Sequence, residues 1–172
     1  MIKDKPYIIA ISGVKNSGKT TLLSRLIPFF SGKGLRVAVI KHDGHDFEPD
    51  VPGTDSSRCR LAGAFGTAVF SENRCMLVRE RKGTTPEEIA AFFPEADLIF
   101  LEGFKSSKYP KLELIRKGNS RESVCCRENL LAAATDLDGP PDHLPEGIPV
   151  LNLNDTQAIA AFIMRYMQET EQ

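Results

Sequence analysis

The stretch Gly-Val-Lys-Asn-Ser-Gly-Lys-Thr at residues 13–20 constrains the fold of this chain more than any other feature. It lies between the apolar run 7–11, which is typical of a buried strand, and a helical pattern of apolar residues that runs from Leu22 to Phe30. A strand, a glycine-rich loop and a helix in this order form a P-loop, or Walker A motif. The motif predicts an α/β fold in which a strand delivers the loop and a helix N-terminus receives an anion.

The P-loop residues also predict the chemistry of the bound anion. The glycines let successive backbone N–H groups turn inward around phosphate oxygens, and Lys19 neutralises charge on the β- and γ-phosphates. The Thr20 hydroxyl is placed to ligate Mg²⁺. We therefore expect a nucleoside triphosphate and Mg²⁺ as ligands.

Strand and helix patterns alternate along the rest of the chain. The predicted strands cover residues 35–40, 98–101, 112–115, 130–134 and 148–153. Helices are predicted at 55–62, between a Thr85 cap and Pro94, and after Asn154 or Asp155. Residues 67–70 and 76–78 are predicted to pair as a small β-hairpin. Together these elements predict one domain over residues 1–172, a three-layer P-loop fold with a mainly parallel sheet and helices on both faces.

Glu102 closes the apolar run 98–101, and this pattern is expected of a central buried strand whose tip carries a Walker-B-type carboxylate. Such a carboxylate can hold Mg²⁺, directly or through a water, or orient an attacking water. We therefore predict that Glu102 is the catalytic residue and shares the metal with Thr20.

Composition argues against several classes of partner. The net charge is −1, from 22 basic and 23 acidic residues, so no global field draws the chain to nucleic acid or to an anionic membrane. No segment approaches the ~20 apolar residues needed to span a bilayer. The cysteines show neither a CxxC pair nor secretory spacing, which predicts reduced thiols at Cys59, Cys75, Cys125 and Cys126. We expect a cytoplasmic protein.

Thr135 and Asp136 follow the apolar run 130–134, a position where many P-loop proteins carry an acid that recognises the base. A carboxylate can accept hydrogen bonds from both N1–H and the 2-amino group of guanine, and adenine lacks that pair of donors. The chain has no Asn-Lys-x-Asp signature, however, so an ordinary aspartate at the end of a strand explains the pattern equally well.

Four stretches in a fixed order carry a resemblance to a known family: GVKNSGKTT, KHDGHDFEPD, PGTDSSRCRLAGA and LIFLEGFK. Any P-loop protein could share the first, but the other three are more specific. They make most of the chain similar to the molybdopterin-guanine dinucleotide biosynthesis accessory proteins known as MobB. The resemblance implies a GTP-binding homodimer with weak or no hydrolysis alone. It also implies a partner enzyme, the guanylyltransferase that joins GMP to molybdopterin.

The same resemblance assigns roles to particular residues. It places Glu102 near Mg²⁺ and phosphate binding on Gly13, Lys15, Asn16, Ser17, Gly18, Lys19, Thr20 and Thr21. Family members tend to carry Lys-His and a further His after the second strand, here Lys41, His42 and His45. Many have a lysine where this chain has Thr54, so one positive charge is missing from the expected anion site, to which Asp55 and Arg58 would also belong.

The Lys41–Asp46 cluster has several interpretations. His42 and His45, with Asp43 and Asp46, could bind a metal, but they form no complete ligand set. A sensor of the nucleotide state, or a binding surface for a phosphorylated pterin, fits the cluster better, with Lys41 and Arg58 supplying charged donors. Solvated loop charges are the simplest reading. The basic run Lys105, Lys108 and Lys111 could contact an acidic partner or the pterin phosphate, but solvation is its default interpretation. No role is assigned to the basic residues Arg116, Lys117, Arg121 and Arg127.

Two other functions are compatible with a P-loop. A small kinase would need an arginine-rich lid, for which Arg74, Arg79 and Arg81 are candidates, although they lie on or beside the predicted hairpin. A metallochaperone GTPase would need a softer ligand cluster than this sequence shows. An accessory protein for molybdenum cofactor maturation accounts for more of the motifs than either.

Overall fold

The computed structural model describes residues 6–170, which form two compact units. The first contains the described residues up to His42 and those from Pro86 onward, and the second is Asp43–Thr85. The expectation of a single domain stays a prediction. Within residues 6–170, no helix is both long and apolar enough to cross a membrane.

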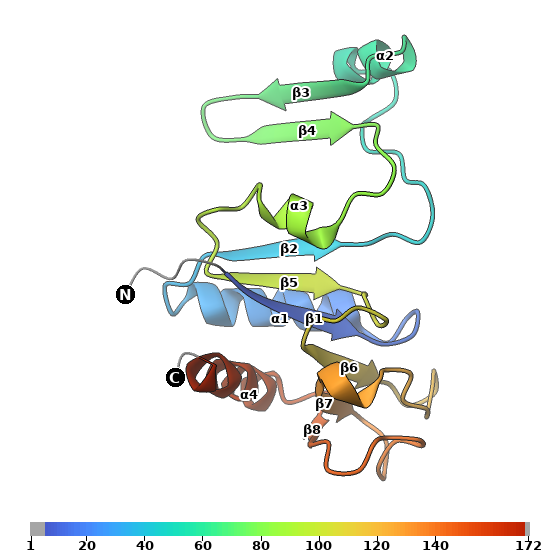
Figure 1. Cartoon of the computed structure of the whole chain (residues 1–172), viewed down its shortest axis with the longest axis vertical. Coiled ribbons are helices and arrows are strands. Elements are labelled where there is room, and N and C mark those ends of the chain that lie inside the picture. The colour runs from blue at the N-terminus through green and yellow to red at the C-terminus, as the bar shows by residue number, and fades with distance from the viewer. Residues whose placement is uncertain (1–5, 171–172) are drawn as a thin grey trace. The chain divides into compact units, whose positions relative to one another are not determined.

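The first unit is built on a six-stranded sheet in the order β2-β5-β1-β6-β7-β8. Every pairing in it is parallel, so the carboxyl ends of the strands meet at one edge, on the right in Figure 1. The strands are β1 (Tyr7–Ser12), β2 (Val37–Lys41), β5 (Leu98–Glu102), β6 (Lys111–Ile115), β7 (Leu130–Thr135) and β8 (Val150–Asn152). This edge is where ligands bind in open parallel sheets.

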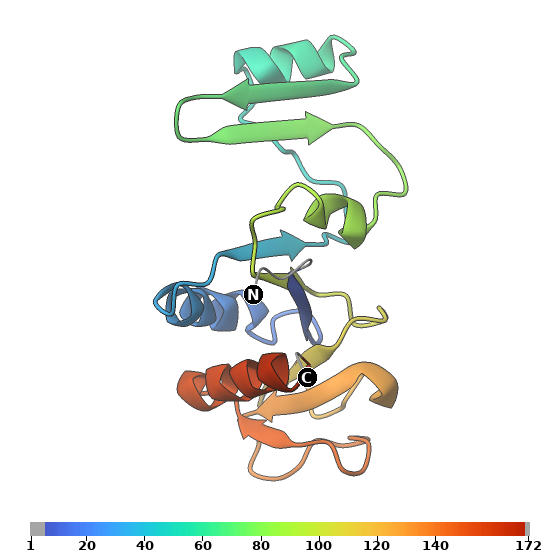
Figure 2. The same cartoon turned by 60° about the vertical axis from the view of Figure 1, so that its left-hand side comes forward.

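Helices cover both faces of this sheet, as predicted. The helices α1 (Lys19–Ser31) and α4 (Thr156–Glu169) lie side by side on one face, as Figure 2 shows. Their apolar stripes pack on β1, β5, β6 and β7, and Leu26 and Phe30 are fully buried there. Each such side chain contributes about 1.5–3 kcal/mol on burial. The short helix α3 (Pro86–Ala90) packs on the other face through Ile89 and Ala90.

The α3 helix is shorter than the sequence predicts. After Ala90 the chain tightens, since the N–H groups of Phe92 and Phe93 donate to carbonyls three residues back, at 3.0 and 2.9 Å. The expected apolar stripe is therefore broken, and Phe92 and Phe93 are 62% and 39% exposed. By contrast, α4 begins as predicted, with the Asp155 side chain accepting from the Ala158 N–H.

The second unit consists of helix α2 (Asp55–Leu61) and an antiparallel pair, β3 (Gly66–Phe70) and β4 (Cys75–Arg79). The Thr54 side chain caps α2 by accepting from the Ser57 N–H. Arg60, whose side chain is largely buried, pairs with Glu48 and, at 3.5 Å, with Glu80. The unit leaves large apolar side chains exposed at Phe47, Val51, Leu61, Phe65, Val69, Phe70 and Leu77.

Candidate nucleotide-binding site

The P-loop connects β1 to α1 in a conformation that depends on its glycines. Gly13 has φ +133°, and a Cβ there would lie 2.4 Å from the Leu114 carbonyl oxygen and 2.8 Å from the Ser17 hydroxyl. Gly18 has φ +92° and caps α1 in the left-handed region, which side chains disfavour. The loop therefore fits against β6 only with glycine at these positions, and it leads directly into the helix N-terminus.

Lys19, the first residue of α1, folds back over this loop. Its Nζ donates to the carbonyl oxygens of Val14, at 2.7 Å, and Gly13, at 3.3 Å. Burial lowers the pKa of this ammonium group, the nearby Glu102 carboxylate raises it, and Lys41 lowers it. A phosphate chain would supply the negative charge that this half-buried cation has only in part from Glu102.

Thr20 and Glu102 meet across the sheet edge. The Thr20 hydroxyl donates to Glu102 Oε1 at 2.7 Å, although the residues are far apart in sequence. Glu102 ends β5 and is only 9% exposed, while the adjacent Ser12 hydroxyl donates to the Gly103 carbonyl at 2.5 Å. A hydroxyl and a carboxylate are the hard oxygen donors that Mg²⁺ prefers, so these two residues fit the metal that the P-loop implies.

A cavity of about 430 Å³ lies at the carboxyl ends of β7 and β8. Asp136 stands in its wall, where Oδ1 accepts from the Lys117 N–H at 2.6 Å, and Thr135 Oγ1 accepts from the Leu137 N–H at 3.1 Å. The volume is in the range of small-molecule sites, and the pocket is wide open to solvent. The lining residues are Thr135, Asp136, Leu137, Asp138, Gly139, Val150, Leu151, Asn152 and Asn154. Recognition of the base by Asp136 stays a prediction, but the residue does lie at a cavity.

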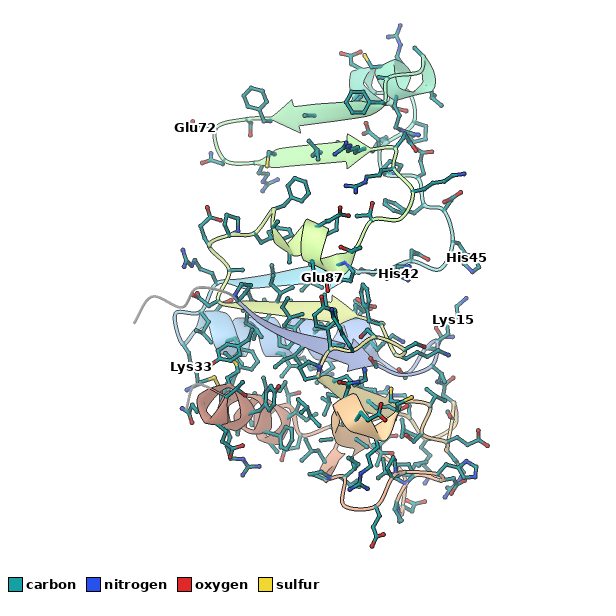
Figure 3. The ribbon with its side chains drawn as sticks, in the orientation of Figure 1. Lys15, Lys33, His42, His45, Glu72 and Glu87 are labelled. Atoms are coloured by element: carbon teal, nitrogen blue, oxygen red, sulfur yellow. The ribbon has the colours of Figure 1, made fainter. Side chains whose placement is uncertain are left out.

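The predicted pterin or partner residues divide between the two units. Lys41 pairs in register with Glu102, and the His42 N–H donates to the Glu102 carbonyl at 3.4 Å. The His42 ring lies 5.5 Å from the Phe104 ring, centre to centre. Figure 3 shows His42 and Lys15 at the carboxyl edge of the sheet and Lys33 at the opposite end of α1. Lys41 and His42 are therefore close to Glu102, on the β5 side of the P-loop.

The remaining predicted residues belong to the second unit. The His45 N–H donates to Asp43 Oδ1 at 3.4 Å, and Arg58 lies 3.8 Å from Asp55 on the exposed side of α2. Across the described residues, no three His, Cys, Asp or Glu side chains gather as metal ligands. The described histidines and aspartates of residues 42–46 therefore do not form the ligand set of a metal site.

The structure adds a turn that the sequence left without a role. Residues 116–119 follow β6 and bridge the P-loop to the cavity, because Asn119 Nδ2 donates to the Lys15 carbonyl at 2.9 Å and the Lys117 N–H donates to Asp136. The Arg116 guanidinium lies directly against Gly18. The available signal was its position directly after the predicted strand 112–115, but the sequence does not show that this strand lies beside β1.

Comparison with known proteins agrees with this arrangement. Residues 8–136 match the family model described as molybdopterin guanine dinucleotide synthesis protein B, MobB. The chain belongs to the MobB family. It is 35% identical, over 94% of both chains, to the Escherichia coli K12 protein named molybdopterin-guanine dinucleotide biosynthesis adapter protein. A Haemophilus influenzae protein of the same name is 32% identical, over 93% of this chain and 89% of that one.

Solved MobB structures have the same fold. The crystal structure of Bacillus subtilis MobB superposes with a TM-score of 0.75 at 28% identity and covers 92% of this chain and 96% of that one. The predicted class, a P-loop fold with a parallel sheet and an added hairpin, is therefore confirmed, as is the resemblance to MobB.

Proposed function

We propose that this protein is a GTP-binding adapter in molybdenum cofactor biosynthesis. It would assist the guanylyltransferase that converts molybdopterin to molybdopterin guanine dinucleotide. The observation that carries the proposal is the Thr20–Glu102 hydrogen bond beside the P-loop, found in a chain that shares most of its length with proteins named as adapters of this synthesis.

In the proposed nucleotide complex, the loop amides of residues 13–18 and the α1 N-terminus surround the phosphates. The Lys19 ammonium leaves the Val14 and Gly13 carbonyls and turns to the β- and γ-phosphates, while Lys15, Asn16, Ser17 and Thr21 complete the phosphate contacts. Mg²⁺ would supply charge neutralisation between the phosphates when bound, held by Thr20 and Glu102.

The role of Glu102 also sets the expected activity. A single buried carboxylate at the metal can orient a water, so we propose at most a weak Mg²⁺-dependent GTPase. Guanine is proposed to occupy the cavity at the ends of β7 and β8. There, the second carboxylate oxygen of Asp136 would accept from the base while Oδ1 stays bonded to the Lys117 N–H.

The other proposed partners are molybdopterin and the guanylyltransferase. Lys41 and His42 at the sheet edge, and His45, Asp55 and Arg58 in the second unit, are proposed to contact molybdopterin or the guanylyltransferase. A cation such as Lys41 or Arg58 is suited to the pterin phosphate. The protein is proposed to act in the cytoplasm.

We also propose that the protein is a homodimer. The exposed apolar side chains of the second unit support this, since an isolated two-stranded hairpin is at best marginally stable in water. Contiguous exposed apolar surface commonly marks a protein interface. Sedimentation equilibrium of wild type and of Phe70→Ser/Leu77→Ser tests the dimer directly.

The adapter role is tested with purified guanylyltransferase, molybdopterin and GTP. The proposal expects this protein to associate with the enzyme in pull-down and to raise the yield of the guanine dinucleotide. Lys19→Ala should still be folded yet give no increase. Neither association nor an increase with wild type, or phosphorylation of a small acceptor instead, would contradict the adapter role.

A further inference from the structure

Arg116 lies against the phosphate-binding loop in a way that packing alone does not explain. A Cβ built on Gly18 would lie 3.2 Å from Arg116 Nη2, 3.3 Å from Cζ and 3.5 Å from Nε. The guanidinium therefore rests on the backbone of the residue that caps the N-terminus of α1. Gly18 is also part of the loop whose amides are expected to hold phosphate.

The Arg116 side chain has hydrogen-bonding capacity to spare. Its Nε is buried and has no hydrogen-bond partner among the described residues. A guanidinium carries five N–H donors and cannot escape the cost of burial by losing its proton. Arg116 is half-buried, and its buried Nε–H has no acceptor. An anion bound beside the P-loop could supply that acceptor.

The backbone around Arg116 is fixed. Its carbonyl accepts from the N–H groups of Asn119, at 3.0 Å, and Ser120, at 3.1 Å, which closes a turn directly after β6. Asn119 ties that turn to the P-loop carbonyl of Lys15. The arginine is thus held beside the loop by the sheet and by the turn together.

The sheet order indicates which phosphates Arg116 can reach. Glu102 and the proposed metal lie on the β5 side of β1, whereas β6 lies on the opposite side, toward β7, β8 and the cavity. The γ-phosphate belongs on the metal side. Arg116 instead faces the phosphates that lie between the P-loop and the base. GDP and GTP share these phosphates.

We propose that Arg116 is a phosphate-binding residue that donates to the β-phosphate of the bound nucleotide. The inference rests on the proposed function, because it assumes a nucleotide in the P-loop. It deepens that function by assigning part of the affinity for the diphosphate to a side chain outside the Walker A sequence.

The test is calorimetric titration of wild type, Arg116→Gln and Arg116→Lys with GDP, GTP and inorganic pyrophosphate. Gln keeps a polar group near the position of Nε but removes the charge and the outer guanidinium atoms, and Lys keeps the charge without the planar fork. The matched control is Arg121→Gln, which removes an equal charge from an exposed arginine a few residues away.

Arg116→Gln should weaken all three ligands by roughly tenfold to a hundredfold, as expected for a charge-assisted hydrogen bond. Arg116→Lys should recover part of the loss, and Arg121→Gln should match wild type. The GTP-to-GDP affinity ratio should not change.

Three results would overturn the assignment. Unchanged affinity for GDP and pyrophosphate would make Arg116 a packing residue only. A loss for GDP that spares pyrophosphate would show an effect through the cavity wall, and a loss limited to GTP would place the contact on the γ-phosphate. Wild type that binds none of the three ligands would instead refute the proposed function, and this inference with it.

Discussion

The Thr20 hydroxyl and the Glu102 carboxylate are joined by a 2.7 Å hydrogen bond across the edge of a parallel sheet. The pair combines the first turn of α1 with the tip of β5, so the donors expected for Mg²⁺ stand together beside the P-loop. Lys19, on the same turn, bonds to loop carbonyls that a phosphate chain would replace.

Glu102→Gln should affect the Mg²⁺-dependent step more than diphosphate binding. Glutamine can still accept from Thr20 but carries no charge for the cation, so the gain in GTP affinity on adding Mg²⁺ should fall by about tenfold or more. GDP binding without Mg²⁺ should stay within about twofold. Calorimetry with and without Mg²⁺ measures both.

The matched control for Glu102 is Asp97→Asn, which removes the same charge just before the other end of β5, where Asp97 binds the Arg36 backbone and side chain. It should leave nucleotide affinity unchanged. Equal losses of GDP and GTP affinity in Glu102→Gln would mean that Glu102 is structural.

Gly18→Ala should impair both stability and nucleotide binding. Alanine at φ +92° costs about 1–2 kcal/mol, and its methyl group would press on the Arg116 guanidinium. GDP affinity should fall by about tenfold or more, the equivalent of one charge-assisted hydrogen bond. Urea denaturation and GDP titration give the two quantities.

Gly34→Ala separates those two effects. Gly34 has φ +83°, but a Cβ there meets nothing within 4 Å. This variant should show a similar loss of stability with wild-type GDP affinity. If Gly18→Ala also bound GDP normally, the loop would tolerate a side chain at its contact with Arg116.

The burial of charged residues shows most clearly what the sequence could and could not predict. Glu102 was predictable because an acid after a buried parallel strand reaches the sheet edge. Lys111 and Glu113 were not: the former looked solvated, yet the two are 1% and 0% exposed. Lys111 Nζ donates to the Ser107 carbonyl at 2.5 Å, and Glu113 accepts from Ser123 and Val124.

Those hydrogen-bond partners come from loops. The periodicity of the apolar residues does not predict which loop will cover a strand. The same limit applies to Arg116. Its proposed role depends on its contact with Gly18, about a hundred residues earlier in the chain. The predicted length of α3 was wrong for a different reason. Its apolar spacing fitted a longer helix, but the turns after Ala90 tightened before Pro94.

Cys125 should differ sharply from the other thiols. Burial, with help from the neighbouring Glu113, raises its pKa to about 12, whereas Cys59, Cys75 and Cys126 are exposed. Because the thiolate is the reactive form, a disulfide reagent at pH 8 should modify three thiols quickly and the fourth only on unfolding. Absorbance of the released thiol follows both phases.

The same raised pKa has a consequence for stability. Between the ordinary thiol pKa of 9.0 and about 12, the unfolded chain loses this proton while the native state keeps it, so the free energy of unfolding should fall as pH rises. Cys125→Ala should remove the slow thiol and reduce this alkaline loss. Four fast thiols in wild type would contradict the burial of Cys125.

The central claim is that the P-loop binds a nucleoside triphosphate through Lys19. Isothermal titration of GTP with Mg²⁺ into wild type and Lys19→Ala tests it most directly, with circular dichroism to confirm that both are folded. The account predicts saturable binding to wild type and loss of tight binding in the variant, because the ammonium charge at the β- and γ-phosphates is gone. Equal affinity in the two proteins, or no binding to wild type, would contradict it.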